Sequence, residues 1–189
     1  MLSLLWTIPA LPLAGFLSLA LLGGRMSRKE VAYIGAGSVG LSALVTILIA
    51  VQFVLAPPEG HAITQHLWMW MHVGSFSSEV AFRLDALSLL MVLVVTVVGF
   101  LIHVYSTEYM AHDADFTRFF AYMNLFVAAM LVLVLADNLP FLFLGWEGVG
   151  LCSYLLIGFW YDDPKNCRAA IKAFLVTRVG DVAISSASF

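Results

Sequence analysis

Residues 139–161 read LPFLFLGWEGVGLCSYLLIGFWY, and this stretch decides the fold. It is long enough to cross a bilayer as a helix, because about 20 apolar residues rising about 1.5 Å each cover a hydrocarbon core of about 30 Å. One carboxylate, Glu147, lies inside it between Trp146 and Gly148. A charge near the bilayer centre costs roughly 2.5–3.5 kcal/mol on insertion scales, so such residues are rare and usually functional. The stretch therefore predicts a transmembrane helix and makes Glu147 the first candidate site residue.

The composition of the whole chain indicates a protein surrounded by lipid. Of the 189 residues, 62% are hydrophobic and 11% are charged, whereas a soluble domain usually carries about 25% charged residues. The formal net charge of −3 argues against a nucleic-acid partner, which needs a basic patch. Cys152 and Cys167 form no C-x-x-C motif, and Cys152 lies within an apolar run. We therefore expect neither a metal or iron–sulfur site nor a disulfide between these cysteines.

Six apolar runs are long enough to cross the membrane, so we predict an all-α integral membrane protein of about six helices. The first run has no basic segment before it, which favours a retained helix over a cleaved signal peptide. The sixth run is less apolar and ends without a polar tail, so we expect the chain to be a fragment. The runs are residues 2–22, 31–56, 86–105, 119–136, 139–161 and about 168–189.

Residues 61–84 differ from the apolar runs. Val80, Phe82 and Leu84 alternate with other residues, and residues 74–75 (Gly-Ser) offer a turn. Period-2 alternation around a turn favours a short β-hairpin with tryptophans at interface depth, and an interfacial amphipathic helix is the alternative. The three histidines of this segment match no helical metal-ligand spacing, so we interpret them as solvated or interfacial; they are His61, His66 and His72.

Residues 35–40, GAGSVG, satisfy the G-x-G-x-x-G pattern of dinucleotide-binding sites. That pattern binds a nucleotide between a strand and a helix of a soluble βαβ unit, whereas this one follows a charged loop and lies in an apolar run. Small residues at such spacing let transmembrane helices approach closely. We therefore predict a helix-packing face that includes Ala36 and Gly40.

The positions of Lys and Arg predict the orientation, because short cytoplasmic loops carry an excess of these residues. If six helices alternate, the loops after the first, third and fifth share one side, and the opposite loops hold only Arg83. Both ends of the chain are therefore expected on the outer side. The basic residues of the shared side are Arg25, Arg28, Lys29, Arg118, Lys165 and Arg168.

Two more charges lie at a depth similar to that of Glu147. By helical rise, Glu147 is roughly 12 Å from the outer end of its helix and Arg178 roughly 15 Å from the inner end of the next. Asp181 follows Arg178 by three positions, which places both on one helical face as an ion pair. A fourth polar residue, His103, we interpret as a satisfied interface histidine rather than a proton relay.

These charges admit two interpretations. In one, Glu147 pairs with a base on a neighbouring helix and only fixes packing. In the other, it is a protonatable site in a proton path, tuned by a nearby base. We favour the second, because carboxylates and bases alternate across neighbouring helices and because Gly145, Gly148 and Gly150 leave room for water or a close helix. Lys172 is either a further relay residue or a side chain that snorkels to the interface.

Several motifs follow one another in an order that resembles a single family. The chain is similar, from near residue 1 to residue 181, to the amino-terminal part of subunit L and chain 5, the antiporter-like membrane subunits of respiratory NADH:quinone oxidoreductase (complex I). The motifs are residues 82–88 (FRLDALS), 118–122 (RFFAY), 136–138 (ADN), 145–159 (GWEGVGLCSYLLIGF), 163–166 (DPKN) and 172–181 (KAFLVTRVGD).

The resemblance implies a proton-translocating membrane subunit that moves protons as quinone is reduced elsewhere in the complex. It implies that Glu147 is the membrane glutamate of the family, and that Arg178 and Asp181 are the neighbouring pair that helps gate or connect the half-channels. Lys172 falls in a family motif, but no role is carried over for it. Residues 1–118 would form an amino-terminal region of three helices and the hairpin. Residues 119–189 would begin a truncated, partial antiporter-like domain.

The resemblance also implies a setting and its limits. The partners would be other membrane-arm subunits of complex I in a bacterial inner membrane, with NADH, FMN, iron–sulfur clusters and quinone bound in other subunits and no cofactor in this chain. The lysine partner of Glu147 would lie beyond residue 189, so we do not expect this chain to translocate protons unassisted. We also expect no catalysis from this chain alone. Two alternatives stay open, a subunit of a multisubunit Na⁺/H⁺ antiporter and a non-transporting membrane scaffold.

Overall fold

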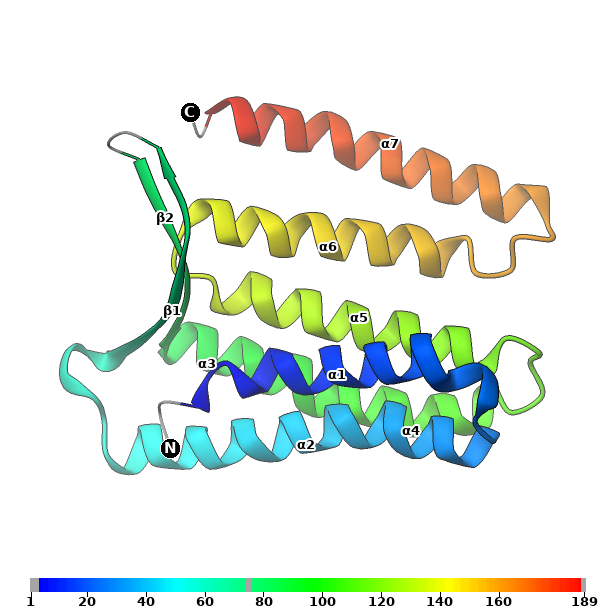
Figure 1. Ribbon diagram of the computed structural model, residues 1–189, viewed down its shortest axis with the longest axis horizontal. Helices are drawn as coiled ribbons and strands as arrows, with labels where there is room; N and C mark the ends of the chain where they lie inside the picture. The colour runs from blue at the N-terminus through cyan, green and yellow to red at the C-terminus, as the bar shows by residue number, and fades with distance from the viewer. Residues whose placement is uncertain (1–3, 74–75, 188–189) are drawn as a thin grey trace.

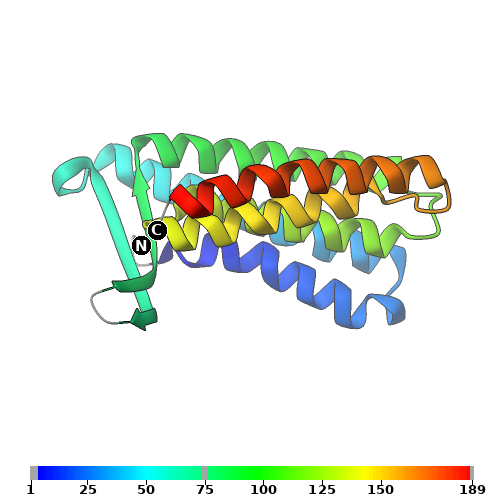
Figure 2. The ribbon, with the colours of Figure 1, turned by 90° about the horizontal axis from the view of Figure 1, so that it is seen from above.

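The computed structural model describes residues 4–73 and 76–187, which form a bundle of long helices with a β-hairpin across one end (Figure 1). Viewed from above, the helices run side by side and the two strands stand crosswise at their ends (Figure 2). In chain order the elements are α1 (Thr7–Leu22), η2 (Gly23–Arg25), α2 (Arg28–Leu55), η3 (Glu59–His61), β1 (Ala62–Val73), β2 (Phe76–Asp85), α3 (Ala86–Leu93), η4 (Val94–Val98), α4 (Gly99–Tyr109), α5 (Phe116–Leu135), α6 (Leu139–Ile157) and α7 (Pro164–Ala187).

Five helices in the described part of the chain have the length and hydropathy to cross a membrane. One of them, residues 86–109, joins α3 and α4 through the π-helical turn η4. The sixth helix, α7, lies beside α6 (Figure 1) but is too polar to join this group, because it carries five charged residues. The chain is thus a multi-pass, helical membrane protein, with five apolar spans and one charged helix where six apolar runs were predicted. The five spans are Thr7–Arg25, Arg28–Leu55, Ala86–Tyr109, Phe116–Leu135 and Leu139–Ile157.

Three helices begin earlier than their apolar runs predicted, and in two of them, α2 and α7, polar residues cap the extended end. Helix α2 begins at Arg28, since Ser27 and Glu30 form a capping box in which the Ser27 amide donates to Glu30 Oε2 at 2.7 Å. Helix α7 begins at Pro164, where the missing N–H costs nothing in a first turn. The Asp163 carboxylate accepts the Lys165 amide at 2.9 Å.

The other boundaries differ by up to five residues. Helix α1 begins at Thr7 rather than at residue 2, and α4 continues to Tyr109 rather than ending at residue 105. Helix α5 begins at Phe116 rather than 119. Helix α6 ends at Ile157 rather than 161, because the chain leaves helical geometry at Gly158, a residue with a high helical cost. Apolar composition thus located every span but not its polar ends.

The segment predicted as hairpin or interfacial helix is an antiparallel hairpin. Ile63 pairs with Leu84 and Gln65 with Phe82, and two register shifts occur farther along β1. Val80, Phe82 and Leu84 are buried as their alternation predicted. The turn predicted at residues 74–75 lies outside the described residues. The interfacial-helix alternative is therefore wrong, and β2 presents an apolar face to the bundle.

Asn138 joins the hairpin to the start of α6. Its side-chain oxygen accepts the Phe141 amide at 3.1 Å, which caps the helix, and its Nδ2 donates to the Glu79 carbonyl of β2 at 2.6 Å. The neighbouring Asp137 amide donates to the Ala81 carbonyl at 3.1 Å. One amide side chain therefore sets where α6 begins, eight positions before Glu147.

The small residues of α2 pack against other helices, as predicted. A Cβ at Gly35 would lie 2.6 Å from the Phe120 ring of α5, and a Cβ at Gly40 would lie 2.8 Å from Phe100 of α4. Ala36 is largely buried in the same face. Because α2 is continuous through residues 35–40, the pattern has no strand–turn–helix context for a nucleotide.

The loops alternate between the two ends of the bundle. The turn after α1, the loop after α4 and the loop after α6 lie at one end, and the hairpin and the α5–α6 turn lie at the other (Figure 1). This arrangement agrees with the alternation from which the loop charges were counted. We call the end that holds the turn after α1 and the loops after α4 and α6 the basic end. Its basic residues are Arg25, Arg28, Lys29, Arg118, Lys165 and Arg168.

Candidate functional site

Glu147 on α6 and Arg178 on α7 form a direct ion pair. The two helices run antiparallel beside each other (Figure 1), so residues 31 positions apart meet across one interface. The side chains are about one quarter exposed, 25% for Glu147 and 29% for Arg178. The prediction that these two residues share a depth is confirmed by their contact, although α7 begins four residues earlier than expected.

Asp181 completes the site but contacts Arg178 only loosely. Its Oδ2 lies 3.7 Å from Arg178 Nε, which is within ion-pair range but beyond a hydrogen bond. Its Oδ1 instead accepts a hydrogen bond of 2.7 Å from the Trp146 indole N–H. The side chain of Asp181 is 6% exposed, so this donor satisfies a nearly buried carboxylate. The i,i+3 pair predicted from the sequence is present, and the stronger contact is one that the sequence did not indicate.

Glycines of α6 set how closely its neighbours approach. A Cβ at Gly145 would lie 2.6 Å from the Leu133 backbone nitrogen of α5, so α5 and α6 pack here without a side chain between them. A Cβ at Gly150 would lie 3.1 Å from a terminal nitrogen of Arg178. Arg178 Cζ also lies 4.4 Å from the centroid of the Phe174 ring, in cation–π geometry. The room predicted beside Glu147 is thus occupied by a helix and by the arginine.

A cavity of about 210 Å³ adjoins the ion pairs between α6 and α7. Such a volume holds several water molecules, since one occupies about 30 Å³ in the liquid. Polar side chains form a small part of its otherwise apolar wall. The lining residues include Trp146, Gly150, Ser153, Tyr154, Thr177 and Asp181.

Lys172 lies outside this cluster. It is exposed on α7, six positions before Arg178, and the described residues offer it no hydrogen bond or ion pair. Six positions correspond to about 9 Å along the helix axis and place it on a different face. The structure therefore brings together Glu147, Arg178 and Asp181, while a relay role for Lys172 stays a prediction.

The interpretation of His103 as a satisfied histidine is confirmed at only one of its two ring nitrogens. The residue is fully buried within the bundle, 0% exposed, with an edge contact to Phe120. Its Nδ1 lies 2.7 Å from the Gly99 carbonyl and must donate, because a carbonyl only accepts. Its Nε2 finds no hydrogen-bond partner among the described residues. Burial inside a helix bundle depends on helix rotation, which the position in the apolar run did not reveal.

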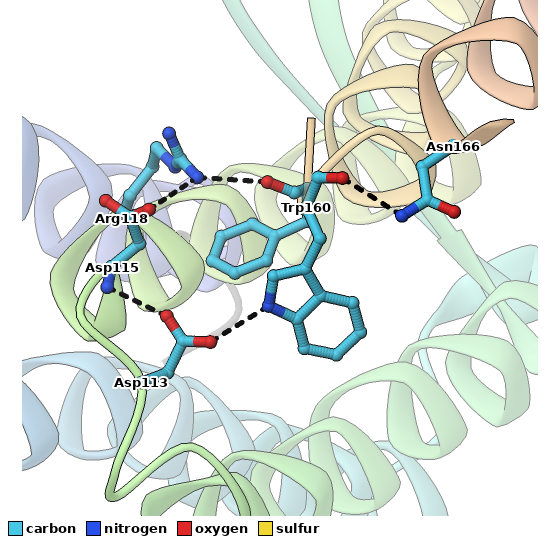
Figure 3. Close-up of polar contacts among 6 residues, drawn as sticks. Asp113, Asp115, Arg118, Trp160 and Asn166 are labelled. Atoms are coloured by element: carbon cyan, nitrogen blue, oxygen red, sulfur yellow. Dashed lines mark hydrogen bonds and ion pairs between the residues drawn. The ribbon is translucent and has the colours of Figure 1, made fainter. Parts of the chain in front are cut away.

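A polar network ties the loops together at the basic end (Figure 3). Arg118 donates to Asp115 at 2.8 Å and to the Phe159 carbonyl at 3.0 Å, which links α5 to the end of α6. The Trp160 indole donates to Asp113 at 2.9 Å. The hydrogen bonds from Trp160 and from the Asp115 amide hold the pKa of Asp113 below its usual value. This network fixes the connection through which α7 folds back on α6.

Among the described residues, no group of three or more His, Cys, Asp or Glu side chains is placed to hold a metal ion. Cys152 and Cys167 are both free thiols.

Two family models match the chain. Residues 70–120 match "NADH-Ubiquinone oxidoreductase (complex I), chain 5 N-terminus", and residues 136–188 match "NADH:quinone oxidoreductase/Mrp antiporter, TM". The second match contains all of the proposed site residues.

Curated relatives are named NADH-quinone oxidoreductase subunit L. The protein of Escherichia coli (strain K12) is 58% identical over 95% of this chain, and that of Pseudomonas aeruginosa is 56% identical over 90%. That of Mycobacterium tuberculosis (strain H37Rv) is 42% identical over 97% of the chain. The chain spans 29%, 28% and 29% of the length of these three relatives.

Solved structures share the fold. The chain is similar to one in the Mrp complex from Dietzia sp. DQ12-45-1b, with a TM-score of 0.77 and 28% identity over 97% of this chain and 19% of the other. A chain of an archaeal membrane-bound sulfane sulfur reductase has a TM-score of 0.79 over 95% of this chain and 35% of its own length, at 15% identity, which indicates the fold alone.

Proposed function

The chain belongs to the family of complex I chain 5 and NADH-quinone oxidoreductase subunit L, and from this we propose that it forms part of a proton-translocating membrane subunit. In this role the other subunits of the oxidoreductase complex reduce quinone, and this chain contributes partly buried charged residues to a proton path. The chain on its own performs no catalysis. NADH, FMN, iron–sulfur clusters and quinone are then bound by other subunits.

The observation that carries the proposal is the contact between Glu147 and Arg178 beside a second carboxylate, Asp181. A carboxylate with a cation beside it favours its charged form, and one that loses the cation in a poorly hydrated site favours the protonated form. Movement of Arg178 therefore provides a way to load and unload a proton on Glu147. The alternative, an ion pair that only stabilises packing, is less favourable, because the cost of removing two charges from water offsets much of their attraction.

An Na⁺/H⁺ antiporter subunit is the second candidate. One observation favours it, the 28% identity and TM-score of 0.77 with a chain of the Mrp complex. The higher identity of 58% to a subunit L favours the oxidoreductase. A membrane scaffold without transport, in which Glu147 is structural, is the third.

We further propose the setting of the chain. It would lie in a bacterial cell membrane beside other membrane-arm subunits, with the basic end toward the cytoplasm and both ends of residues 1–189 on the outer side. The loop charges support this orientation, because cytoplasmic loops carry the excess of Lys and Arg. The division into residues 1–118 and 119–189 is part of the same proposal.

The test replaces Glu147 in the complete subunit within its assembled complex. Glu147→Gln keeps the shape of the side chain but cannot exchange a proton, and we expect proton pumping per NADH oxidised in membrane vesicles to fall while assembly persists. Glu108→Gln, an exposed position on α4, is the matched control. Unchanged pumping with Glu147→Gln contradicts the proposal. Failure of both Glu147→Gln and Glu147→Ala to assemble supports the scaffold.

A further inference from the structure

Two hydrogen-bond donors lie near the Asp181 carboxylate, the Trp146 indole N–H and Arg178 Nε, and only the indole forms a hydrogen bond with it. The Trp146 indole nitrogen lies 2.7 Å from Oδ1, whereas Arg178 Nε lies 3.7 Å from Oδ2. The carboxylate side chain is 6% exposed, so water replaces neither donor easily. The indole N–H therefore supplies the direct hydrogen bond to Asp181, and Arg178 supplies an ion pair without one.

Arg178 has the complementary choice between two carboxylates. It pairs directly with Glu147, although Asp181 lies on its own helix three positions away and within reach of a side-chain rotation. Its Nε is buried and makes no hydrogen bond among the described residues. The hydrogen bond from Trp146 to Oδ1 fixes the orientation of the carboxylate and leaves Oδ2 3.7 Å from Arg178 Nε, which is too far for a hydrogen bond.

We propose that Trp146 is a positioning residue whose indole N–H holds Asp181 and thereby keeps Arg178 on Glu147. The inference deepens the proposed function and rests on it, because it states what sets the position of the movable cation. Tryptophan suits this role, because its side chain has only two rotatable bonds to fix and its indole N–H can only donate a hydrogen bond. The Trp146 ring and Asp181 both form part of the wall of the 210 Å³ cavity, so the hydrogen bond between them lies at its edge.

The experiment removes the N–H and keeps the ring. In the complete subunit within the assembled complex, Trp146→Phe, and an isosteric variant that carries benzothienylalanine at position 146, both lack the donor. A hydrogen bond to a charged group shifts an equilibrium by about tenfold or more. We expect Arg178 to move from Glu147 to Asp181 in a high-resolution structure of the isosteric variant, and pumping per NADH oxidised to fall by up to about tenfold with an altered pH profile.

Trp160→Phe is the matched control, because it also removes an indole N–H donated to an aspartate, at Asp113 of the basic end. We expect it to leave the pH profile of pumping unchanged. If Trp146→Phe does not assemble, the isosteric variant decides. If Arg178 remains on Glu147 in that variant, the proposal is overturned. Unchanged proton pumping in Glu147→Gln would instead overturn the proposed function.

Discussion

Replacing Asn138 should lower the free energy needed to open the junction between the hairpin and α6, by an amount that follows from the two hydrogen bonds that are lost. Asn138→Ala removes the cap on the Phe141 amide, worth about 1 kcal/mol, and the 2.6 Å hydrogen bond to the Glu79 carbonyl, worth about 1 kcal/mol net. The local opening free energy should fall by about 2 kcal/mol. At a factor of ten per 1.4 kcal/mol, amide hydrogen exchange should accelerate by roughly 30-fold.

Asn138→Ser separates the two contributions. Serine caps a helix about as well as asparagine, but its side chain is too short to reach Glu79. We expect the exchange of the Phe141 amide to accelerate by roughly fivefold in Asn138→Ser, against 30-fold in Asn138→Ala. Hydrogen-exchange mass spectrometry of the complete subunit in detergent measures both. Exchange at the wild-type rate in Asn138→Ala would refute this account of the junction.

Further predictions concern packing, pH and orientation. Gly145→Ala should destabilise the purified subunit by about 1–3 kcal/mol in thermal unfolding, because its Cβ would overlap the α5 backbone, whereas Gly37→Ala, with open space around it, should be neutral or stabilising by up to about 1 kcal/mol. The pKa of Asp113 is lowered in the folded protein, so its contribution to stability is present above the unfolded pKa of about 3.9 and is lost as pH falls through the folded pKa. Trp160→Phe removes the main cause of that lowered pKa, so its melting temperature should fall less steeply below pH 4 than that of the wild type. An equally steep fall in both proteins would contradict this. Ser77→Cys in the hairpin should react with a membrane-impermeant thiol reagent on intact cells, because the hairpin is proposed to face outward. Labelling only after permeabilisation would indicate the opposite orientation.

Local patterns in the sequence predicted much of the fold. Apolar runs located each of the spanning helices, and period-2 alternation identified the hairpin around Phe82. The polar ends were less accurate, because the capping box of Ser27 and Glu30 moves the start of α2 into a charged segment. The same kind of local chemistry at Pro164 extends α7 toward the basic end.

The candidate site was predicted in part. A carboxylate at Glu147 and an i,i+3 pair at Arg178 and Asp181 follow from single-helix geometry, and so does their similar depth. The bond from Trp146 to Asp181 spans 35 positions and two helices, so no local pattern indicated it. The burial of His103 was missed for the same reason.

The sequence by itself determined which segments cross the membrane and which of them carry charge, because the transfer of apolar and charged groups into lipid depends on composition over one helix length. Only the tertiary structure decided which charges meet. The rotation and spacing of α6 and α7 depend on side chains of several helices at once, such as the missing side chain of Gly145 against α5. That packing brings Arg178 to Glu147 and the Trp146 indole to Asp181, and it turns three separate charges into one site.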